Sequence, residues 1–319
     1  MNRDDSVHPH VPGLMIAPVE VRDWPAALAI LFATFPVDEQ QPRIDSTLVS
    51  VSEGRLNLSG LRWGLENGEP VAASLTMEQP DGITLVWPPV VTTAASDPIA
   101  VEAALMREVT ARLDASSARL GQILLDPAET PDSSVYQAHG FTAITNLDFL
   151  VRELSDDLPA ATDEADWTAE AFDASRNADR FAALLEASYT GSLDCTVLEG
   201  LRNGREALAS HRLSGEFRPE LWILYRAGET DVAVVLLNEH PEQSAVELVY
   251  FGVLPSARGR GYGRKALIHA LNVAKQHGGR LVFLAVDSKN SFAIEIYGQL
   301  GFSHLSRRQA LFRWPGGLA

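Results

Sequence analysis

The sequence contains a single cysteine, Cys195, among its 319 residues. One cysteine excludes an internal disulfide and a cysteine-based metal site, and we predict no metal in this protein. A thiol nucleophile also needs a positioned base, which the sequence does not reveal, so we interpret Cys195 as a packing residue. Long apolar runs are absent too, and residues 1–18 lack the basic start and apolar core of a secretory leader. We therefore expect a cytoplasmic protein with no membrane partner.

Lysine is absent from residues 1–160, where 9 arginines stand against 23 acidic residues for a net charge of −14. The rest of the chain carries 17 basic and 19 acidic residues. Within it, residues 252–289 hold seven basic residues and one acid, Asp287. This local excess favours an anionic ligand with several phosphates, whereas the acidic remainder of the surface would repel a nucleic acid. A solvated basic face without a ligand is the alternative.

A glycine-rich hexapeptide, Arg258 to Gly263, separates a strand-like run (residues 246–254) from a helix-like run (residues 264–277). Its alternate glycines remove Cβ atoms, so that consecutive N–H groups can converge on an anion at the positive end of the helix. The glycine spacing does not fit a dinucleotide-binding fingerprint, and the Gly-Lys-Ser/Thr ending of a P-loop is missing. The pattern predicts a phosphate-binding loop, with a glycine-rich surface turn as the alternative.

Two motifs resemble those of the GCN5-related N-acetyltransferase (GNAT) superfamily. Arg258, Gly261 and Gly263 match its acetyl-CoA-binding pattern, Gln/Arg-x-x-Gly-x-Gly/Ala. A second pattern, Asn-x-x-Ala-x-x-x-Tyr-x-x-x-Gly-Phe, is matched further on by Asn290, Ala293, Tyr297, Gly301 and Phe302. The motifs occur in the family's order, and the resemblance covers the chain from about Trp167 onward. It implies a transferase that uses acetyl-CoA.

The first half of the chain repeats the order of elements in the second half. Residues 136–141 read Tyr-Gln-Ala-His-Gly-Phe and echo residues 297–302, and each segment follows a helix-like run, an apolar strand and an aspartate. A repeat of this length indicates two copies of one domain. We predict an α/β (α+β) fold with tandem GNAT-like domains at residues 1–158 and 159–319. Each would be a mixed, mostly antiparallel sheet flanked by helices, with one splayed strand pair, an organisation similar to that of mycothiol synthase.

The two copies differ at the turn that would hold the phosphates. After Val91 the first copy reads Thr-Thr-Ala-Ala-Ser-Asp-Pro, with no glycine or arginine. Asp97 would repel a pyrophosphate, and a backbone without glycine is less free to converge its N–H groups. We therefore predict that the first copy has the fold but binds acetyl-CoA poorly, and that Tyr136 is structural.

The resemblance also implies where acetyl-CoA contacts the second copy. The strand before the loop would splay from the strand at residues 281–286, and the pantetheine arm would enter the gap. Backbone groups of Phe251 and Val253 would pair with the arm, Asn290 would orient it, and the N–H of Tyr262 should matter more than its ring. The residues expected to contact acetyl-CoA are Phe251, Val253, Arg258, Gly259, Arg260, Gly261, Tyr262, Gly263, Arg264 and Asn290.

Two side chains are candidates for catalysis. Glu247 lies in an apolar strand eleven residues before Arg258, the spacing of the catalytic glutamate in the histone-acetylating branch of the superfamily. We expect it to take a proton from the amine, directly or through water; an outward-facing edge-strand carboxylate is the alternative. Tyr297 is expected to act as general acid, because a phenol is protonated at neutral pH. A helix residue that packs by its ring is the alternative for Tyr297.

The acceptor is less well determined by the sequence. The resemblance places its pocket at about Ser188 to Leu213, where Tyr189, Asp194 and Glu199 could bind an ammonium group, although most loop acids are simply solvated. We predict acetyl transfer to a primary amine of a small molecule, because the second copy could cover the groove that a protein substrate would need. The alternatives are a protein or peptide N-acetyltransferase and a non-catalytic acyl-CoA sensor.

Overall fold

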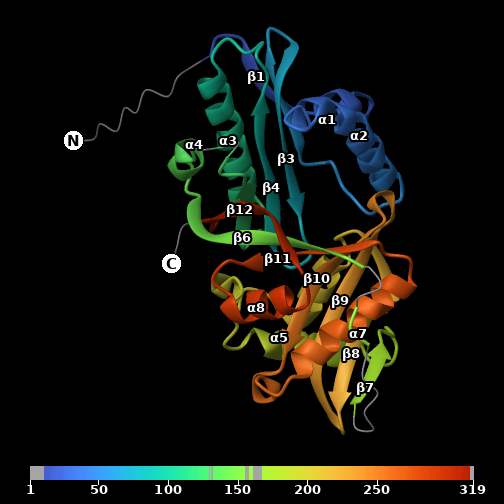
Figure 1. The fold of residues 1–319 in the computed structure, drawn as a ribbon. Helices are drawn as coiled ribbons and strands as arrows, with labels where there is room; N and C mark the ends of the chain where they lie inside the picture. Colours follow the sequence, from blue (N-terminus) through green and yellow to red (C-terminus); the bar gives the residue numbers. More distant parts are fainter. Residues whose placement is uncertain (1–10, 129, 131, 155–157, 161–166, 317–319) are drawn as a thin grey trace, which may run out of the picture. The chain divides into compact units, whose positions relative to one another are not determined.

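Two compact units make up the chain in a computed structural model (Figure 1). Unit 1 comprises Met1–Ile144 and Ala310–Ala319, and unit 2 comprises Thr145–Gln309. Each unit is a mixed β-sheet with helices, which confirms the predicted fold class. The structure describes residues 11–128, 130, 132–154, 158–160 and 167–316.

Unit 1 is a sheet with the strand order β1-β2-β3-β4-β5-β12, in which β4 and β5 run parallel. Alternate residues of β3 pack on opposite sides, Ala72 in a cluster with residues of α3 and Ala73 in a cluster with residues of α1 and α2. The strands are β1 (Leu14–Pro18), β2 (Leu61–Glu66), β3 (Glu69–Glu78), β4 (Ile83–Val91), β5 (Leu120–Leu125) and the end of β12 (Ser303–Arg313). The helices are η1 (Val21–Asp23), α1 (Trp24–Leu31), α2 (Val37–Ser52), α3 (Pro98–Ala115) and α4 (Ser134–Ala138).

Unit 2 is a sheet with the strand order β12-β6-β11-β10-β9-β8-β7, in which β10 and β11 run parallel. Its strands are β6 (Thr142–Glu153), β7 (Trp167–Ala171), β8 (Glu216–Ala227), β9 (Thr230–His240), β10 (Ala245–Val253), β11 (Leu281–Asp287) and the start of β12. Its helices are α5 (Ala178–Tyr189), η2 (Thr196–Leu198), α6 (Gly204–His211), η3 (Pro241–Gln243), η4 (Pro255–Ala257), α7 (Tyr262–Gln276) and α8 (Ser291–Gln299).

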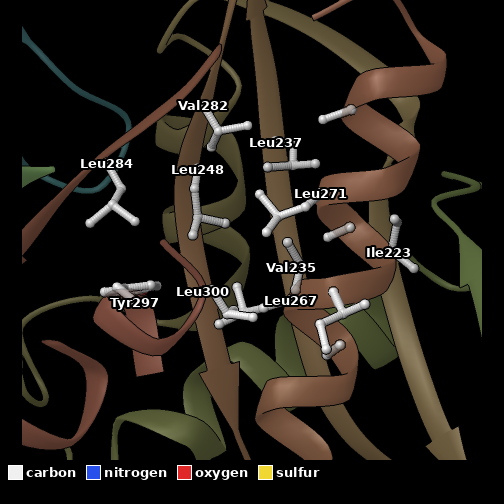
Figure 2. Close-up of a cluster of buried hydrophobic side chains, with 14 of the residues drawn as sticks. Ile223, Val235, Leu237, Leu248, Leu267, Leu271, Val282, Leu284, Tyr297 and Leu300 are labelled. Carbon is white, nitrogen blue, oxygen red and sulfur yellow. The ribbon is translucent and has the colours of Figure 1, made fainter. Parts of the chain in front are cut away.

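Strand β9, between β10 and β8, is buried on both faces. Val235 and Leu237 pack in one cluster with Leu267 and Leu271 of α7 (Figure 2). The alternate residues of β9 pack in a second cluster with residues of α5 and α6. Because side chains alternate along a strand, burial on both faces requires the continuous apolar run that β9 shows.

A local sequence signal fixes the start of α6. The helix begins at Gly204, with Asn203 as its N-cap residue. Asn203 accepts a hydrogen bond from the N–H of Glu206 (2.9 Å), and the Glu206 side chain accepts one from the N–H of Asn203 (3.0 Å). This capping box fixes the start of the helix. None of the helices in the described part of the chain is both long and apolar enough to span a membrane.

The division into units does not fall at residues 158 and 159. Residues 147–153 of β6 pair antiparallel with β11 over its whole length, so the chain joins unit 2 from Thr145 onward. The last ten residues in turn belong to unit 1. The boundary predicted at residues 158 and 159 between the two sequence copies stays a prediction, and residues 155–157 and 161–166 beside it lie outside the described residues.

Candidate active site

The loop before α7 presents unpaired backbone N–H groups. Gly259 and Gly261 have φ of +73° and +81°, a left-handed conformation that favours glycine. Gly261 is the N-cap residue of α7, and its position provides no side-chain cap. Among the described residues, the backbone N–H groups from 259 to 264 have no hydrogen-bond partner, and the N–H of Lys265 bonds the Gly261 carbonyl (3.2 Å). Free N–H groups at the positive end of a helix form a site for an anion.

Gly263 lets the start of α7 pack closely on β10. A Cβ at residue 263 would lie 3.0 Å from Cζ of Phe251 and 3.2 Å from Cγ2 of Val253. Both distances are shorter than ordinary van der Waals contacts between carbon atoms. The glycine therefore holds the anion site against the end of β10.

The side chain of Arg258 joins the end of β10 to the end of α5. Its guanidinium donates to the carbonyl oxygens of Val253 (3.2 Å), Ser188 (2.8 Å) and Gly191 (3.0 Å). Arg258 therefore fixes the base of the loop through backbone contacts, and its role as an anion ligand stays a prediction. The hydrogen bond from Arg258 Nε occupies the carbonyl of Val253, which is one of the backbone groups expected to pair with the pantetheine arm.

The ring of Tyr262 also has a structural role. It stacks on Trp167 with ring centroids 5.6 Å apart and planes 11° apart, and Trp167 stacks in turn on Tyr225 (5.2 Å, 22°). The guanidinium of Arg260 lies 5.2 Å from the centre of the Tyr262 ring. The stack holds the first turn of α7 against β7 and β8, and it keeps one loop arginine beside the unpaired N–H groups. Arg264, in the first turn, is exposed.

Strands β10 and β11 separate after three residue pairs. Ala245, Val246 and Glu247 pair with Leu281–Phe283, and no later residue of β10 has a partner in β11. On its other edge β10 stays paired with β9 as far as Val253. The expected splay is therefore present, and it leaves one edge of β10 unpaired at Phe251 and Val253.

Glu247 lies at the last paired position before the splay. Its side chain retains 23% of its exposure, and its Oε2 accepts hydrogen bonds from Ser214 Oγ (2.6 Å) and from His240 Nε2 (3.1 Å). Its neighbours Val246 and Leu248 pack toward α7, so Glu247 points to the opposite face, on the side of α5 and α6. Glu247 is thus a half-buried carboxylate with fixed hydrogen-bond partners. The alternative hypothesis, an outward-facing edge-strand carboxylate, would have required a solvated side chain.

Tyr297 is buried in α8 and packs beside Leu284 of β11 (Figure 2). Burial raises the pKa of its phenol, and the nearby Asp194 and Tyr250 raise this pKa further. Its ring also contacts Phe302, with centroids 5.5 Å apart. Asn290 is the N-cap residue of α8, where its Oδ1 accepts from the N–H of Ala293 (3.2 Å). The side-chain oxygen of Asn290 thus caps the helix, and its amide NH₂ has no hydrogen-bond partner among the described residues and could meet a cofactor arm.

The loop after α5 is tied to the end of β11 by two carboxylates. Asp194 Oδ1 accepts from the N–H of Asp287 (2.8 Å), and Asp287 accepts from the N–H of Cys195 (3.2 Å) and from Thr145 (2.7 Å). Asp194 is exposed as a residue, but its carboxylate turns inward, where lost hydration and the charge of Asp287 raise its pKa. Burial and these two acids raise the pKa of the Cys195 thiol to about 12. Cys195 is therefore a poor nucleophile.

Three polar side chains that lie close together, with Tyr250 near Tyr297, were not singled out from the sequence. Ser188 and Tyr250 share a hydrogen bond of 2.7 Å, and the His211 ring lies 5.5 Å from the Tyr250 ring. Burial, with the charge of Arg202, lowers the pKa of His211 to about 3, so its imidazole is neutral. A register shift between Leu248 and Tyr250 resets the alternation of β10 and places Tyr250 on the α5 side. Simple alternation from Glu247 could not reveal this.

Unit 1 lacks the anion site at the equivalent position. Asp97 is the N-cap residue of α3, and its carboxylate accepts from the N–H of Ala100 (3.1 Å). Pro98, the first residue of the helix, has no N–H to offer. The hydroxyl of Tyr136 donates to Glu102 of the same helix (3.0 Å), and Tyr136 is buried. The acid thus occupies an N–H group whose counterpart is free at the start of α7, and the tyrosine hydroxyl has a structural partner.

We expect the whole chain to bind one molecule of acetyl-CoA. An isothermal titration with acetyl-CoA should give a stoichiometry of one per chain, because the equivalent helix α3 begins with Asp97 and Pro98 in place of the glycine loop that precedes α7. The variant Gly261→Val should weaken binding at this single site and leave no site of wild-type affinity. A second site that persists in this variant would show that unit 1 binds acetyl-CoA despite Asp97.

Comparisons with known proteins agree with this geometry. Residues 193–302 match the model of the acetyltransferase (GNAT) family. A mycothiol acetyltransferase from a Nocardioides species is 26% identical over 192 residues, which cover 54% of this chain and 62% of that protein. The chain spans less than two thirds of the length of the curated relatives that it matches, with 28% and 62% covered.

Solved structures of low sequence identity share the fold along nearly the whole chain. A GCN5-related N-acetyltransferase from Sphaerobacter thermophilus superposes with a TM-score of 0.71 at 18% identity, covering 95% of this chain and 96% of the other. A tandem GNAT protein from the clavulanic acid biosynthesis pathway gives a TM-score of 0.59 at 14% identity, covering 96% and 100%. Residues 193–302 therefore match the GNAT acetyltransferase family, and the chain shares its fold with solved GNAT proteins, a tandem one among them.

Proposed function

We propose that this protein is an N-acetyltransferase that moves an acetyl group from acetyl-CoA to the primary amine of a small molecule. The observation that carries the proposal is the anion site at the start of α7, which packs on the residues of β10 that have no partner in β11. The free N–H groups suit a pyrophosphate, and the unpaired strand edge suits the amides of a pantetheine arm. When bound, acetyl-CoA supplies an acetyl group activated as a thioester.

Glu247 is the proposed general base. An ammonium group must lose a proton before its nitrogen can attack, and a carboxylate beside the splay can accept that proton directly or through one water. The hydrogen bonds from Ser214 and His240 hold one of its oxygens, so the geometry supports a fixed acceptor. Its position on the face of α5 and α6 agrees with an acceptor pocket formed by the loop between these helices.

Tyr297 is proposed to stabilise the departing sulfur. Because burial and Asp194 raise the pKa of its phenol, Tyr297 stays protonated throughout the neutral range. A phenol that is so reluctant to ionise acts mainly by donating a hydrogen bond as negative charge develops on sulfur. The buried side chain and its raised pKa support this role, and they make complete proton transfer from Tyr297 the harder path.

The acceptor is proposed to be a small molecule, because the curated relatives are mycothiol acetyltransferases. The inward carboxylate of Asp194, near Tyr297 and Tyr250, is suited to bind an ammonium group in the acceptor.

The proposal is tested by release of free thiol from acetyl-CoA against a panel of primary amines. At least one amine should support release above background hydrolysis, and Tyr297→Phe should lower kcat about 10-fold through the lost hydrogen bond, with acetyl-CoA affinity unchanged. Tight acetyl-CoA binding without thiol release for any amine would instead identify a sensor.

A further inference from the structure

Glu247 has one anchored carboxylate oxygen and one free oxygen. Both of its hydrogen bonds, from Ser214 and from His240, reach Oε2. An ionised carboxylate can only accept, so Ser214 donates its hydroxyl proton and His240 carries its proton on Nε2. Among the described residues, Oε1 has no hydrogen-bond partner. The side chain is thus held by one oxygen and presents the other.

The position of Ser214 is built into the sheet. Asn238, which is fully buried on β9, accepts from the indole N–H of Trp222 (2.9 Å). Its amide donates to the carbonyl oxygens of His211 and Ser214. Because every donor and acceptor of a buried amide must be satisfied, these bonds fix the segment after α6 opposite Glu247.

The position of His240 depends on a glycine and an aromatic ring. A Cβ at Gly215 would lie 2.7 Å from Nε2 of His240, so only glycine leaves room for the imidazole, and its φ of +83° also favours glycine. On the other side the imidazole lies 5.2 Å from the ring of Phe283. The other ring nitrogen, Nδ1, lies 3.7 Å from Oε1 of Glu242. The imidazole is therefore confined with Nε2 toward Glu247.

We propose that His240 and Ser214 are positioning residues, which hold Glu247 so that Oε1 faces the amine of the acceptor. This inference rests on the proposed function, in which Glu247 is the base. Neither residue touches the substrate; each acts through the carboxylate. Holding a catalytic group in one orientation removes the freedom that would otherwise lower the fraction of productive encounters.

The test is a double-mutant cycle measured by steady-state thiol release. His240→Phe keeps a ring against Phe283 but removes the donor, and Ser214→Ala removes the hydroxyl. Each should lower kcat about 5- to 10-fold, as expected for a lost hydrogen bond to a charged group, and leave KM for acetyl-CoA unchanged. His240→Gln, which can place an N–H near the position of Nε2, should recover most of the loss. In the Glu247→Gln background neither substitution should lower kcat further.

The outcomes separate this inference from the proposed function. Wild-type kcat in both His240→Phe and Ser214→Ala, with Glu247→Gln slow, would overturn the positioning role alone. Equal losses with and without Glu247 would also overturn it, since the residues would then act independently of the carboxylate. A wild-type kcat in Glu247→Gln would contradict the assignment of Glu247 as the base, and with it the positioning role of His240 and Ser214. Should His240→Phe fail to fold, as judged by its melting temperature, Ser214→Ala carries the same test.

Discussion

Replacing Glu247 by glutamine is expected to lower kcat about 100-fold or more, the size typical of a lost general base. Glutamine keeps the length of the side chain, and its carbonyl oxygen can accept the same bonds from Ser214 and His240. It cannot take a proton from an ammonium group, so the chemical step should suffer while KM for acetyl-CoA stays unchanged. Steady-state thiol release with the best amine of the panel measures both constants.

The control for Glu247→Gln is Glu239→Gln. Glu239 is a half-buried carboxylate on the neighbouring strand, opposite Val246, where it pairs with Arg218 (3.0 Å). When the charge of Glu239 is removed, Arg218 still pairs with Glu216, so kcat should stay unchanged. The deficit of Glu247→Gln should also shrink as the pH rises, because more of the amine is then neutral without a base. A deficit that is absent, or constant with pH, would contradict the assignment.

Replacing Gly261 by valine is expected to weaken acetyl-CoA binding about 100-fold, the loss of one or two charge-assisted hydrogen bonds. A β-branched residue at φ of +81° is strained, so the loop should adopt another conformation. The N–H groups from 259 to 264 would then no longer converge. Isothermal titration of acetyl-CoA into the variant gives the affinity directly.

The matched control for Gly261→Val is Gly278→Val, at the other end of α7. Gly278 has φ of +89°, and like Gly261 it has open space around the added Cβ. Each variant should lose about 1–2 kcal/mol of stability to backbone strain. Only the change at residue 261 should weaken binding. Similar affinity losses in the two variants would show that the loop acts through helix stability and does not hold the phosphates.

The anion loop was predictable from the sequence because its conformation is set locally. Alternate glycines permit the positive φ of Gly259 and Gly261, and the apolar runs on either side specify β10 and α7. The spacing of Asn290 and Tyr297 follows from helix geometry in the same way, since Asn290 is the N-cap residue of α8 and Tyr297 lies on the buried side of this helix. The absence of the glycine loop from the first copy was also visible, because residues 92–98 contain no glycine and Asp97 is the N-cap residue of α3.

Other parts of the site depend on residues far apart in the sequence. Arg258 was expected beside the phosphates, yet its guanidinium donates to Ser188 and Gly191 at the end of α5. Whether Glu247 was solvated or fixed depended on Ser214, which reaches it from the segment after α6. No local pattern indicates which carbonyl or hydroxyl will lie opposite a given side chain once the elements pack.

The sequence by itself determined the glycine loop, the two family motifs and the copy that carries them, because backbone sterics and helix spacing act within a few residues. Only the tertiary structure decided that residues from Thr145 onward belong to unit 2 and the last ten to unit 1, since strand pairing joins distant segments. It also decided which oxygen of Glu247 is held and which is free. Oε2 is the oxygen that is held because His240 packs near Gly215 and Phe283, and these three residues come from separate segments of the chain.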